Sequence, residues 1–372
     1  MPFSMTRLQA FALIPLWSVT FPIVGSSLLA LYLSGVAFEG ASGLITGLTA
    51  TVLIGSVLAA VHHAEVVAHR VGEPFGTLVL ALAITIIEVA LIVSLMISGG
   101  PATAQLARDT VFAAVMLILN GMVGLCLLVG ASHYREQTFS LYGVSAALTT
   151  LAAIAILTLV LPNYTVTVPG PVYSSSQLVF VAVVSLVLYG IFVLVQTVRH
   201  RDYFLPPDAH TGQSTHLSPP SNFLAITSAV LLFISLVVVV VLAKLLAPSI
   251  EKAVLTLGAP KAIVGIIIAA VVLMPEGMAA YRAARANRLQ TSLNLALGSA
   301  LASIGLTIPA VAAVALINGW TLTLGLDLKS TVLLMLSLFI CALSLGTGRT
   351  TVLQGSVLLV LLITYLFTTI VP

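Results

Sequence analysis

Charged side chains are scarce in this sequence. They make up 7% of the chain, whereas an ordinary soluble domain carries about 25%, so a soluble globular fold is excluded. Cysteine is scarce too: Cys126 and Cys341 stand alone in apolar segments and form no CxxC pair. This excludes a cysteine-based metal or redox centre, and we expect both thiols to be buried as small apolar side chains.

Positive charge is too thinly spread to suit a nucleic acid. The formal net charge is only +3, and the arginines fall in short polar segments between apolar runs rather than along one stripe. The sequence contains no phosphate-binding loop, Gly-x-Ser-x-Gly elbow or dinucleotide fingerprint. We therefore expect no nucleic-acid partner, no organic cofactor and no enzymatic activity.

Long apolar runs dominate the chain. Hydrophobic residues make up 60% of it, and the mean hydropathy is +1.19. Breaking the runs at charges, prolines and glycines predicts an all-α polytopic membrane protein with eleven transmembrane helices. The expected limits are 10–33, 42–68, 75–98, 109–131, 140–161, 177–198, 223–247, 260–283, 291–316, 330–346 and 350–370. The first run is too long for the apolar core of a signal peptide, so we expect a retained helix.

The order of the spans suggests an internal duplication. The longest polar connection, Arg199 to Asn222, contains two Pro-Pro pairs, and its composition indicates a flexible linker. After the first span, five spans precede this linker and five follow it. Because five is odd, the second set would enter the membrane from the opposite side, as in the inverted repeats of secondary transporters. The expected parts are an N-terminal helix (1–38), a first five-helix repeat (39–199), a cytoplasmic linker (200–222) and a second five-helix repeat (223–372).

Lysine and arginine at the span ends predict the orientation. Nine would lie on the side of the N-terminus, and five on the other. The nine are Arg7, Arg70, Arg135, Arg199, Arg201, Arg282, Arg285, Arg288 and Arg349, and the five are Arg108, Lys244, Lys252, Lys261 and Lys329. Cytoplasmic loops carry the excess of such residues. We therefore expect a cytoplasmic N-terminus and a periplasmic or extracellular C-terminus.

Two acidic residues stand deep inside apolar spans. Glu88 and Glu276 each occupy the second span of their expected repeat. An ionised side chain at the bilayer centre costs about 2.5–3.5 kcal/mol, so such residues usually face ions, water or partner groups. No lysine or arginine lies in the spans at comparable depth, which disfavours a purely structural salt bridge. Each carboxyl could hold either a proton or a cation, the simplest basis for antiport.

The neighbours of the two acids add oxygen atoms. Thr85 lies three residues before Glu88 and shares its helix face. Pro275 precedes Glu276 and would leave the carbonyl near Val271 without its helical donor, as in the broken helices of transporters. Oxygen ligands suit hard cations such as Ca²⁺ or Na⁺.

A histidine-rich segment, from His62 to Glu73, lies at the end of the second expected span. A zinc-dependent hydrolase would need HExxH spacing, which the segment lacks. His63, Glu65 and His69, with Glu73, could instead form a proton path or vestibule near the cytoplasmic end of the span. A polar cap at the membrane interface is the equal alternative.

With these residues in view, the sequence resembles the calcium/proton exchanger branch of the cation/Ca²⁺ exchanger superfamily, and within it the bacterial ChaA-type sodium-potassium (calcium)/proton antiporters. The first family signature is approximately ATEELALRLGETLGGLL followed by GNAxE. The second is similar to MPEGMAAYRAARANR followed by LNLALGSALASIGLTIP. The residues that match are Glu65, Arg70, Gly72, Glu73, Gly76, Glu88, Glu276, Asn287, Gly298 and Ser303.

The resemblance implies an antiporter of the bacterial inner membrane that exports Ca²⁺, Na⁺ or K⁺ in exchange for protons. It implies that Glu88 and Glu276 carry cation and proton in turn. The expected neighbouring ligands are Thr85, Asn120, Ser299 and Ser303. Thr85 replaces an asparagine that is usual in the family, and this leaves the choice between Ca²⁺ and the monovalent cations open.

Two functions of other classes remain as alternatives. A passive cation channel would use the same buried acids without coupling to protons. A membrane-embedded hydrolase built on His63, Glu65 and His69 would need a bound transition metal. Apart from transported cations and protons, the lipid bilayer is the only partner we expect.

Overall fold

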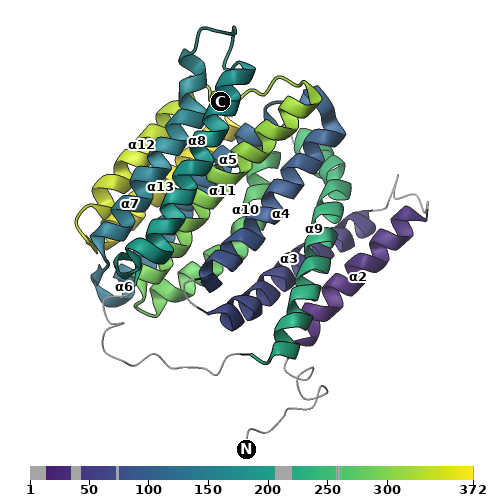
Figure 1. Cartoon of the computed structure of the whole chain (residues 1–372), viewed down its shortest axis with the longest axis horizontal. Helices are drawn as coiled ribbons and strands as arrows, with labels where there is room; N and C mark the ends of the chain where they lie inside the picture. Colours follow the sequence, from purple (N-terminus) through teal and green to yellow (C-terminus); the bar gives the residue numbers. More distant parts are fainter. Residues whose placement is uncertain are drawn as a thin grey trace, which may run out of the picture. The chain divides into compact units, whose positions relative to one another are not determined.

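The structure, a computed structural model, describes residues 14–34, 43–72, 75–205, 220–256, 258, 260 and 262–371. Helices make up nearly all of them (Figure 1). The long helices are α2 (Leu16–Leu33), α3 (Gly43–Val71), α4 (Phe75–Gly99), α5 (Leu106–Met116), α6 (Gly124–Tyr134), α7 (Leu141–Ala155), α8 (Ser175–Leu194), α9 (Asn222–Thr256), α10 (Ala262–Arg285), α11 (Leu289–Asn318), α12 (Leu328–Leu345) and α13 (Val352–Ile370). A two-residue antiparallel pair joins β1 (Gln137–Thr138) to β2 (Arg349–Thr350).

Three of the passes contain a turn of π-helix. These are η2 (Leu117–Val123) between α5 and α6, η3 (Ile156–Val160) after α7, and η5 (Val195–Arg199) after α8. Short 3-10 turns complete the connections: η1 (Gly100–Thr103), η4 (Leu161–Tyr164) and η6 (Arg201–Phe204). With η2 joining α5 to α6, the described residues form eleven helical passes close to the eleven predicted spans.

The surface composition fits a membrane environment. Ten of the described helices are long and apolar enough to span a bilayer, and α4 contributes a shorter apolar stretch, Leu82–Ile97. Large apolar side chains stay exposed in mid-helix: Phe339 is 59% and Phe367 61% exposed. Such exposure is expected where lipid rather than water surrounds a helix. The chain is therefore an all-α polytopic membrane protein, as predicted.

Packing divides the chain into two compact units. Unit 1 comprises Met1–Ser94 and Thr215–Leu257, and unit 2 comprises Leu95–Ser214 and Gly258–Pro372. Unit 1 therefore combines helices from both sides of the linker. Each unit is described by itself below.

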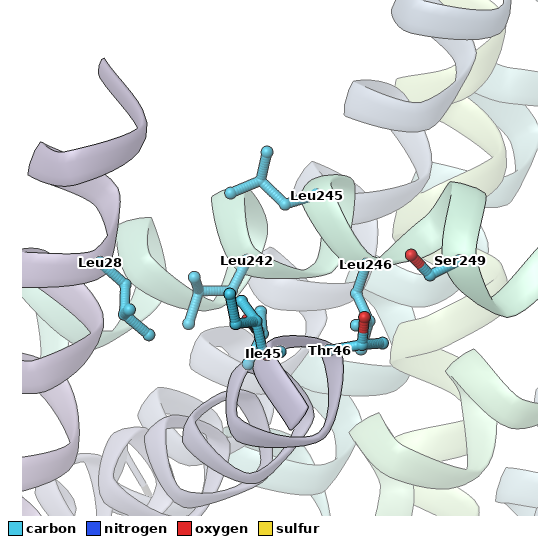
Figure 2. A pocket seen from close by; sticks show the side chains of 8 residues that line it. Leu28, Ile45, Thr46, Leu242, Leu245, Leu246 and Ser249 are labelled. Atoms are coloured by element: carbon cyan, nitrogen blue, oxygen red, sulfur yellow. Dashed lines mark hydrogen bonds between the residues drawn. The ribbon is translucent and has the colours of Figure 1, made fainter. Parts of the chain in front are cut away.

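In unit 1, helices α2, α3 and α9 pack against one another. Glycines allow the close approach: a Cβ on Gly55 of α3 would collide with the ring of Phe21 on α2, and one on Gly25 of α2 would collide with Val238 of α9. A small pocket of about 60 Å³ lies between these three helices. Leu28, Ile45 and Leu242 line it together with Thr46 and Ser249 (Figure 2).

In unit 2, α10 and α11 pack together, and α11 also packs against α5, η2, α7 and α8 (Figure 1). A close helix crossing joins α6 to α13. A Cβ on Gly355 would lie 2.7 Å from the carbonyl oxygen of Gly124, and one on Gly124 would lie 3.2 Å from that of Gly355. Small residues at such a crossing let two membrane helices approach at backbone distance. Cys126 and Cys341 are both buried as free thiols, as predicted.

One end of unit 2 is closed by loops that share backbone hydrogen bonds. The amide of Gly325 donates to Pro171 at 3.0 Å, and that of Leu326 donates to Leu159 in η3 at 2.9 Å. The hydroxyl of Tyr173 donates to the carbonyl of Leu157, also in η3, at 2.5 Å. Burial raises the pKa of Tyr173 to about 12, so this phenol keeps its proton and remains a donor at physiological pH.

The opposite end of unit 2, which we call the basic end, consists of the turns 133–140, 199–205, 282–290 and 346–351. Side chains tie these turns together: Tyr134 donates to the carbonyl of Arg285 at 3.0 Å, and Asn294 to that of Phe204 at 2.6 Å. The seven arginines at this end are Arg135, Arg199, Arg201, Arg282, Arg285, Arg288 and Arg349, all of them exposed. Two acids, Glu136 and Asp202, accompany them.

The prolines inside the membrane helices do not break them. Helix α10 continues through Pro275, as α11 does through Pro309. The span expected at 260–283 is thus one continuous helix, and the carbonyl near Val271 still lacks the amide donor that Pro275 cannot supply. A single proline removes one amide donor, and tight packing holds the remaining turns in helical form.

Candidate ion-binding site

Glu276 is the best-defined member of the expected site. It lies in the middle of α10 and is only 6% exposed. The hydroxyl of Ser299, on α11, donates a short hydrogen bond to the Oε2 atom of Glu276. The structure thus joins two of the residues that the sequence predicted as ligands, and both are buried oxygen donors.

Asn120 lies in the π-helical turn η2 and is fully buried. Its Nδ2 atom donates to Ser337 Oγ on α12 at 2.9 Å. Ser337 gives its own proton to the carbonyl of Leu333 at 2.7 Å, so it can only accept from Asn120. This fixes the amide with its oxygen turned away from Ser337.

The amide oxygen of Asn120 is buried and has no hydrogen-bond partner among the described residues. An orphaned buried oxygen is costly unless a ligand satisfies it. Helical π-turns are frequent at functional sites because they redirect side chains and release backbone groups. The chemistry of this oxygen suits a hard cation, which agrees with the sequence-based assignment of Asn120 as a ligand.

Ser303 lies one turn after Ser299 on α11 and is 1% exposed. Nearby, α8 approaches α11 closely, since a Cβ on Gly305 would lie 2.9 Å from the Cβ of Tyr189. Gly277, next to Glu276, faces Met122 of η2. The segments that carry Glu276, Ser299 and Asn120 therefore pack together within unit 2.

Glu88 and Thr85 belong to unit 1. Both lie on α4 and both are buried, with exposures of 4% and 5%. Their spacing of three residues places them on one helix face, as predicted. A buried carboxyl with a buried hydroxyl one turn away repeats the chemistry of Glu276 and Ser299 on a single helix.

The histidine-rich segment lies at the end of α3. His63 is fully buried, whereas Glu65 and His69 are exposed, because positions two and six residues after His63 point to other faces of the helix. That these residues form a proton path or vestibule stays a prediction, with a polar cap at the membrane interface as its alternative. Glu73, the remaining member, lies outside the described residues. Within the described part of the chain, no three His, Cys, Asp or Glu side chains form a metal-binding group.

His63 instead connects two helices. Its Nε2 atom lies 3.0 Å from the carbonyl oxygen of Ser18 on α2. That carbonyl would normally accept from the amide of residue 22, but residue 22 is a proline inside α2 and has no N–H. His63 therefore supplies the donor that Pro22 removes.

A comparison with known protein families identifies the family of this chain. The family described as sodium/calcium exchanger protein matches residues 40–198 and 227–371, most of the sequence. The chain belongs to the sodium/calcium exchanger family. This agrees with the resemblance to the cation/Ca²⁺ exchanger superfamily that the sequence signatures indicated, and the family is one of transporters.

Individual relatives match this chain over most of its length. It is 48% identical to "Putative ionic transporter y4hA" of Sinorhizobium fredii (strain NBRC 101917 / NGR234), over 99% of this chain and 100% of the relative. It is 37% identical to the sodium-potassium/proton antiporter ChaA of Escherichia coli (strain K12), over 85% and 86%. The crystal structure of the H⁺/Ca²⁺ exchanger CAX matches with a TM-score of 0.69 and 15% identity, over 94% of this chain and 88% of that one, a likeness of fold.

Sequence reasoning missed Ser337 and the π-helical turn. Ser337 stands alone in an apolar run, and only a knowledge that α12 packs against η2 would connect it to Asn120. A hydroxyl residue deep inside an apolar span was the available signal. The pair Asn120-Gly121 was noticeable, but nothing in its sequence predicts i to i+5 hydrogen bonding.

Proposed function

We propose that this protein is a proton-coupled cation antiporter. Glu88 and Glu276 bind a cation from one side of the membrane, and protons from the other side displace it. The transported cation is Ca²⁺, Na⁺ or K⁺, and the proton gradient drives its export. Sliding or rocking of a few helices switches access to the site between the two sides.

The observation that carries this proposal is the buried Glu276 carboxylate with the Ser299 hydroxyl bound to it, in a chain that is 37% identical to a sodium-potassium/proton antiporter. A carboxylate inside a membrane span can be neutralised by a proton or by a cation, and the two compete. The Ser299 hydroxyl can donate to the bare carboxylate or turn its lone pairs toward a bound cation. The orphaned oxygen of Asn120 adds a further ligand of the same hard type.

The proposal includes the duplicated architecture: an N-terminal helix (1–38), repeats at 39–199 and 223–372, and a linker between them. The two segments matched by the family model, 40–198 and 227–371, support these limits. Packing within unit 2 supports them too. In the proposed repeats, the pass from α5 to α6 corresponds to α11, and α8 corresponds to α13. The contact between α8 and α11 should then have a counterpart between α13 and α6, and both contacts are present.

We further propose that the protein resides in a bacterial inner membrane with its N-terminus in the cytoplasm and its C-terminus outside. The basic end of unit 2 supports this orientation, since seven exposed arginines lie there against two acids. Among the described residues at the opposite end, two cations, Arg108 and Lys329, face two acids, Asp109 and Asp327. The excess of arginine marks the cytoplasmic side.

Everted membrane vesicles that carry the protein test this function. Their interior is acidified by respiration, and Ca²⁺, Na⁺ and K⁺ are added one at a time while the pH gradient is followed with a fluorescent amine. Antiport predicts that at least one cation collapses the gradient in a saturable manner, and that vesicles without the protein do not respond. Cation flux that ignores the pH gradient would instead indicate a channel and would overturn the proposal.

A further inference from the structure

An apolar groove runs between α7 and α12 on the outside of unit 2. Its volume is about 460 Å³, within the roughly 300–1,000 Å³ of ligand pockets. Small residues line this space: Ser145 and Ala152 on α7, Ala342 on α12 and Gly346 just after it. Leu141, Val144, Leu148, Thr149, Leu338 and Leu345 complete the lining.

The groove lies within the membrane-spanning part of both helices, since α7 and α12 are each long and apolar enough to span a bilayer. Ser145, Thr149 and Ala342 are exposed along it, so the groove opens outward rather than into the protein core. What fills an outward-facing apolar groove at this depth must itself be apolar, because water is absent there.

The groove ends at the basic end of unit 2. Leu141 is the first residue of α7, and Gly346 directly follows α12. The strand before α7 pairs with the strand after α12, with Thr138 opposite Arg349. The side chain of Arg349 is 70% exposed, and its Nη1 atom lies 3.9 Å from Oε2 of Glu136. This pairing is too loose to neutralise it firmly.

Aromatic rings flank the same mouth. The ring of Tyr142 stacks on Tyr203 with centroids 5.1 Å apart, and Tyr203 stacks on His200 at 4.9 Å. Tyrosines are enriched where a membrane meets water, because the ring is apolar and its hydroxyl is polar. This mouth of the groove therefore lies at headgroup level.

We propose that the groove between α7 and α12 binds an anionic phospholipid, with one acyl chain between the helices and the headgroup phosphate at Arg349. The charge of the basic end selects the occupant. A second copy of the protein in the same membrane orientation would bring its own seven arginines next to these seven, and like charges repel. An anionic headgroup instead attracts them. This binding is independent of the antiport proposed above.

Native mass spectrometry of the full chain, purified in a mild detergent, tests the site. Phosphatidylglycerol and phosphatidylcholine with identical acyl chains are added separately, and the fraction of protein that retains one lipid is measured. We expect wild-type protein to retain phosphatidylglycerol about fivefold better, the contribution of roughly one basic residue at a membrane surface. Equal retention of the two lipids would overturn the proposal.

Substitutions test the groove and the charge of Arg349 separately. Ala342→Leu fills the groove and should lower retention of both lipids, whereas Ala313→Leu, at an exposed alanine of α11 outside it, should not. Arg349→Gln should remove the preference for phosphatidylglycerol, whereas Arg282→Gln, with the same charge loss on α10, should keep it. If Ala342→Leu retains lipid like wild type, or changes the proportion of dimer instead, the groove is not a lipid site.

Thermal unfolding in detergent controls for folding. All four substituted residues are exposed, so each variant should unfold close to the wild-type temperature. If Ala342→Leu unfolds at a lower temperature than wild type, Arg349→Gln still tests the proposal, because this variant can lose the preference for phosphatidylglycerol without any change in the groove.

Discussion

A serine hydroxyl and a carboxylate on adjacent helices define the chemistry at Glu276. Ser299 donates to Glu276, and both side chains are buried. In a bilayer interior this bond has little water to compete with it, so its contribution to holding the carboxylate in place is large.

Ser299→Ala should raise the cation concentration for half-maximal exchange by about tenfold or more, because it removes a hydroxyl whose lone pairs would turn to the bound cation, and a loss of about 1.4 kcal/mol in binding is tenfold. The measurement is cation-dependent proton flux in vesicles. Ser185→Ala is the matched control: Ser185 is also buried, but its hydroxyl donates to the Val181 carbonyl of its own helix. Equal shifts in the two variants would contradict a special role for Ser299.

Asn120→Leu should impair exchange more than it impairs folding, since it removes an amide oxygen that no other described group satisfies. Ser337→Ala should give a milder defect of the same kind, because it frees the amide to rotate without removing it. Flux assays and thermal unfolding of both variants separate the two effects. If Asn120→Leu transports normally, this residue is not a ligand.

The residues of the site were partly predictable from sequence. Glu88 and Glu276 stand out because a carboxylate is expensive in an apolar span, and family signatures indicated Ser299 and Ser303. The bond between Ser299 and Glu276 required the structure, since it depends on how α10 and α11 pack. Ser337 was missed for the same reason.

At the scale of helices, α6 and α13 approach at backbone distance in unit 2. Gly355→Ala should destabilise the protein by about 1–3 kcal/mol through overpacking, because the added Cβ would meet the Gly124 carbonyl at 2.7 Å. Gly190→Ala should be neutral or stabilising by about 0.5–1 kcal/mol, since a Cβ there meets nothing within 4 Å. Chemical unfolding in detergent compares them, and equal effects would refute the close crossing.

The contact between α2 and α3 provides a second test at this scale. His63→Phe should cost about 1–3 kcal/mol, because the Ser18 carbonyl loses its donor. Pro22→Ala restores a helical amide for that carbonyl, so His63→Phe should cost less in the Pro22→Ala background. Unfolding free energies of the two single variants and the double variant measure the coupling, and strictly additive costs would contradict this role of His63.

Helix positions were predictable and helix details were not. Eleven apolar runs correspond to eleven helical passes among the residues that the structure describes, because a span of about 20 apolar residues leaves the backbone no other way to satisfy its hydrogen bonds. The π-helical turns depend on packing with neighbouring helices, which the sequence of one helix does not contain.

For the whole molecule, the central claim is that two carboxylates, one in each proposed repeat, exchange a cation for protons. The same family model matches both sides of the linker, so each half should contribute one acid to transport. Neither acid alone should be sufficient.

The most direct measurement is proton flux in proteoliposomes that are acidic inside, with Ca²⁺, Na⁺ or K⁺ added outside, for wild type, Glu88→Gln and Glu276→Gln. Glu136→Gln, which alters an exposed acid 57% accessible to solvent, is the matched control. The account predicts cation-dependent loss of the pH gradient in wild type and in Glu136→Gln, and none in the other two variants. Full exchange in either Glu88→Gln or Glu276→Gln would contradict it.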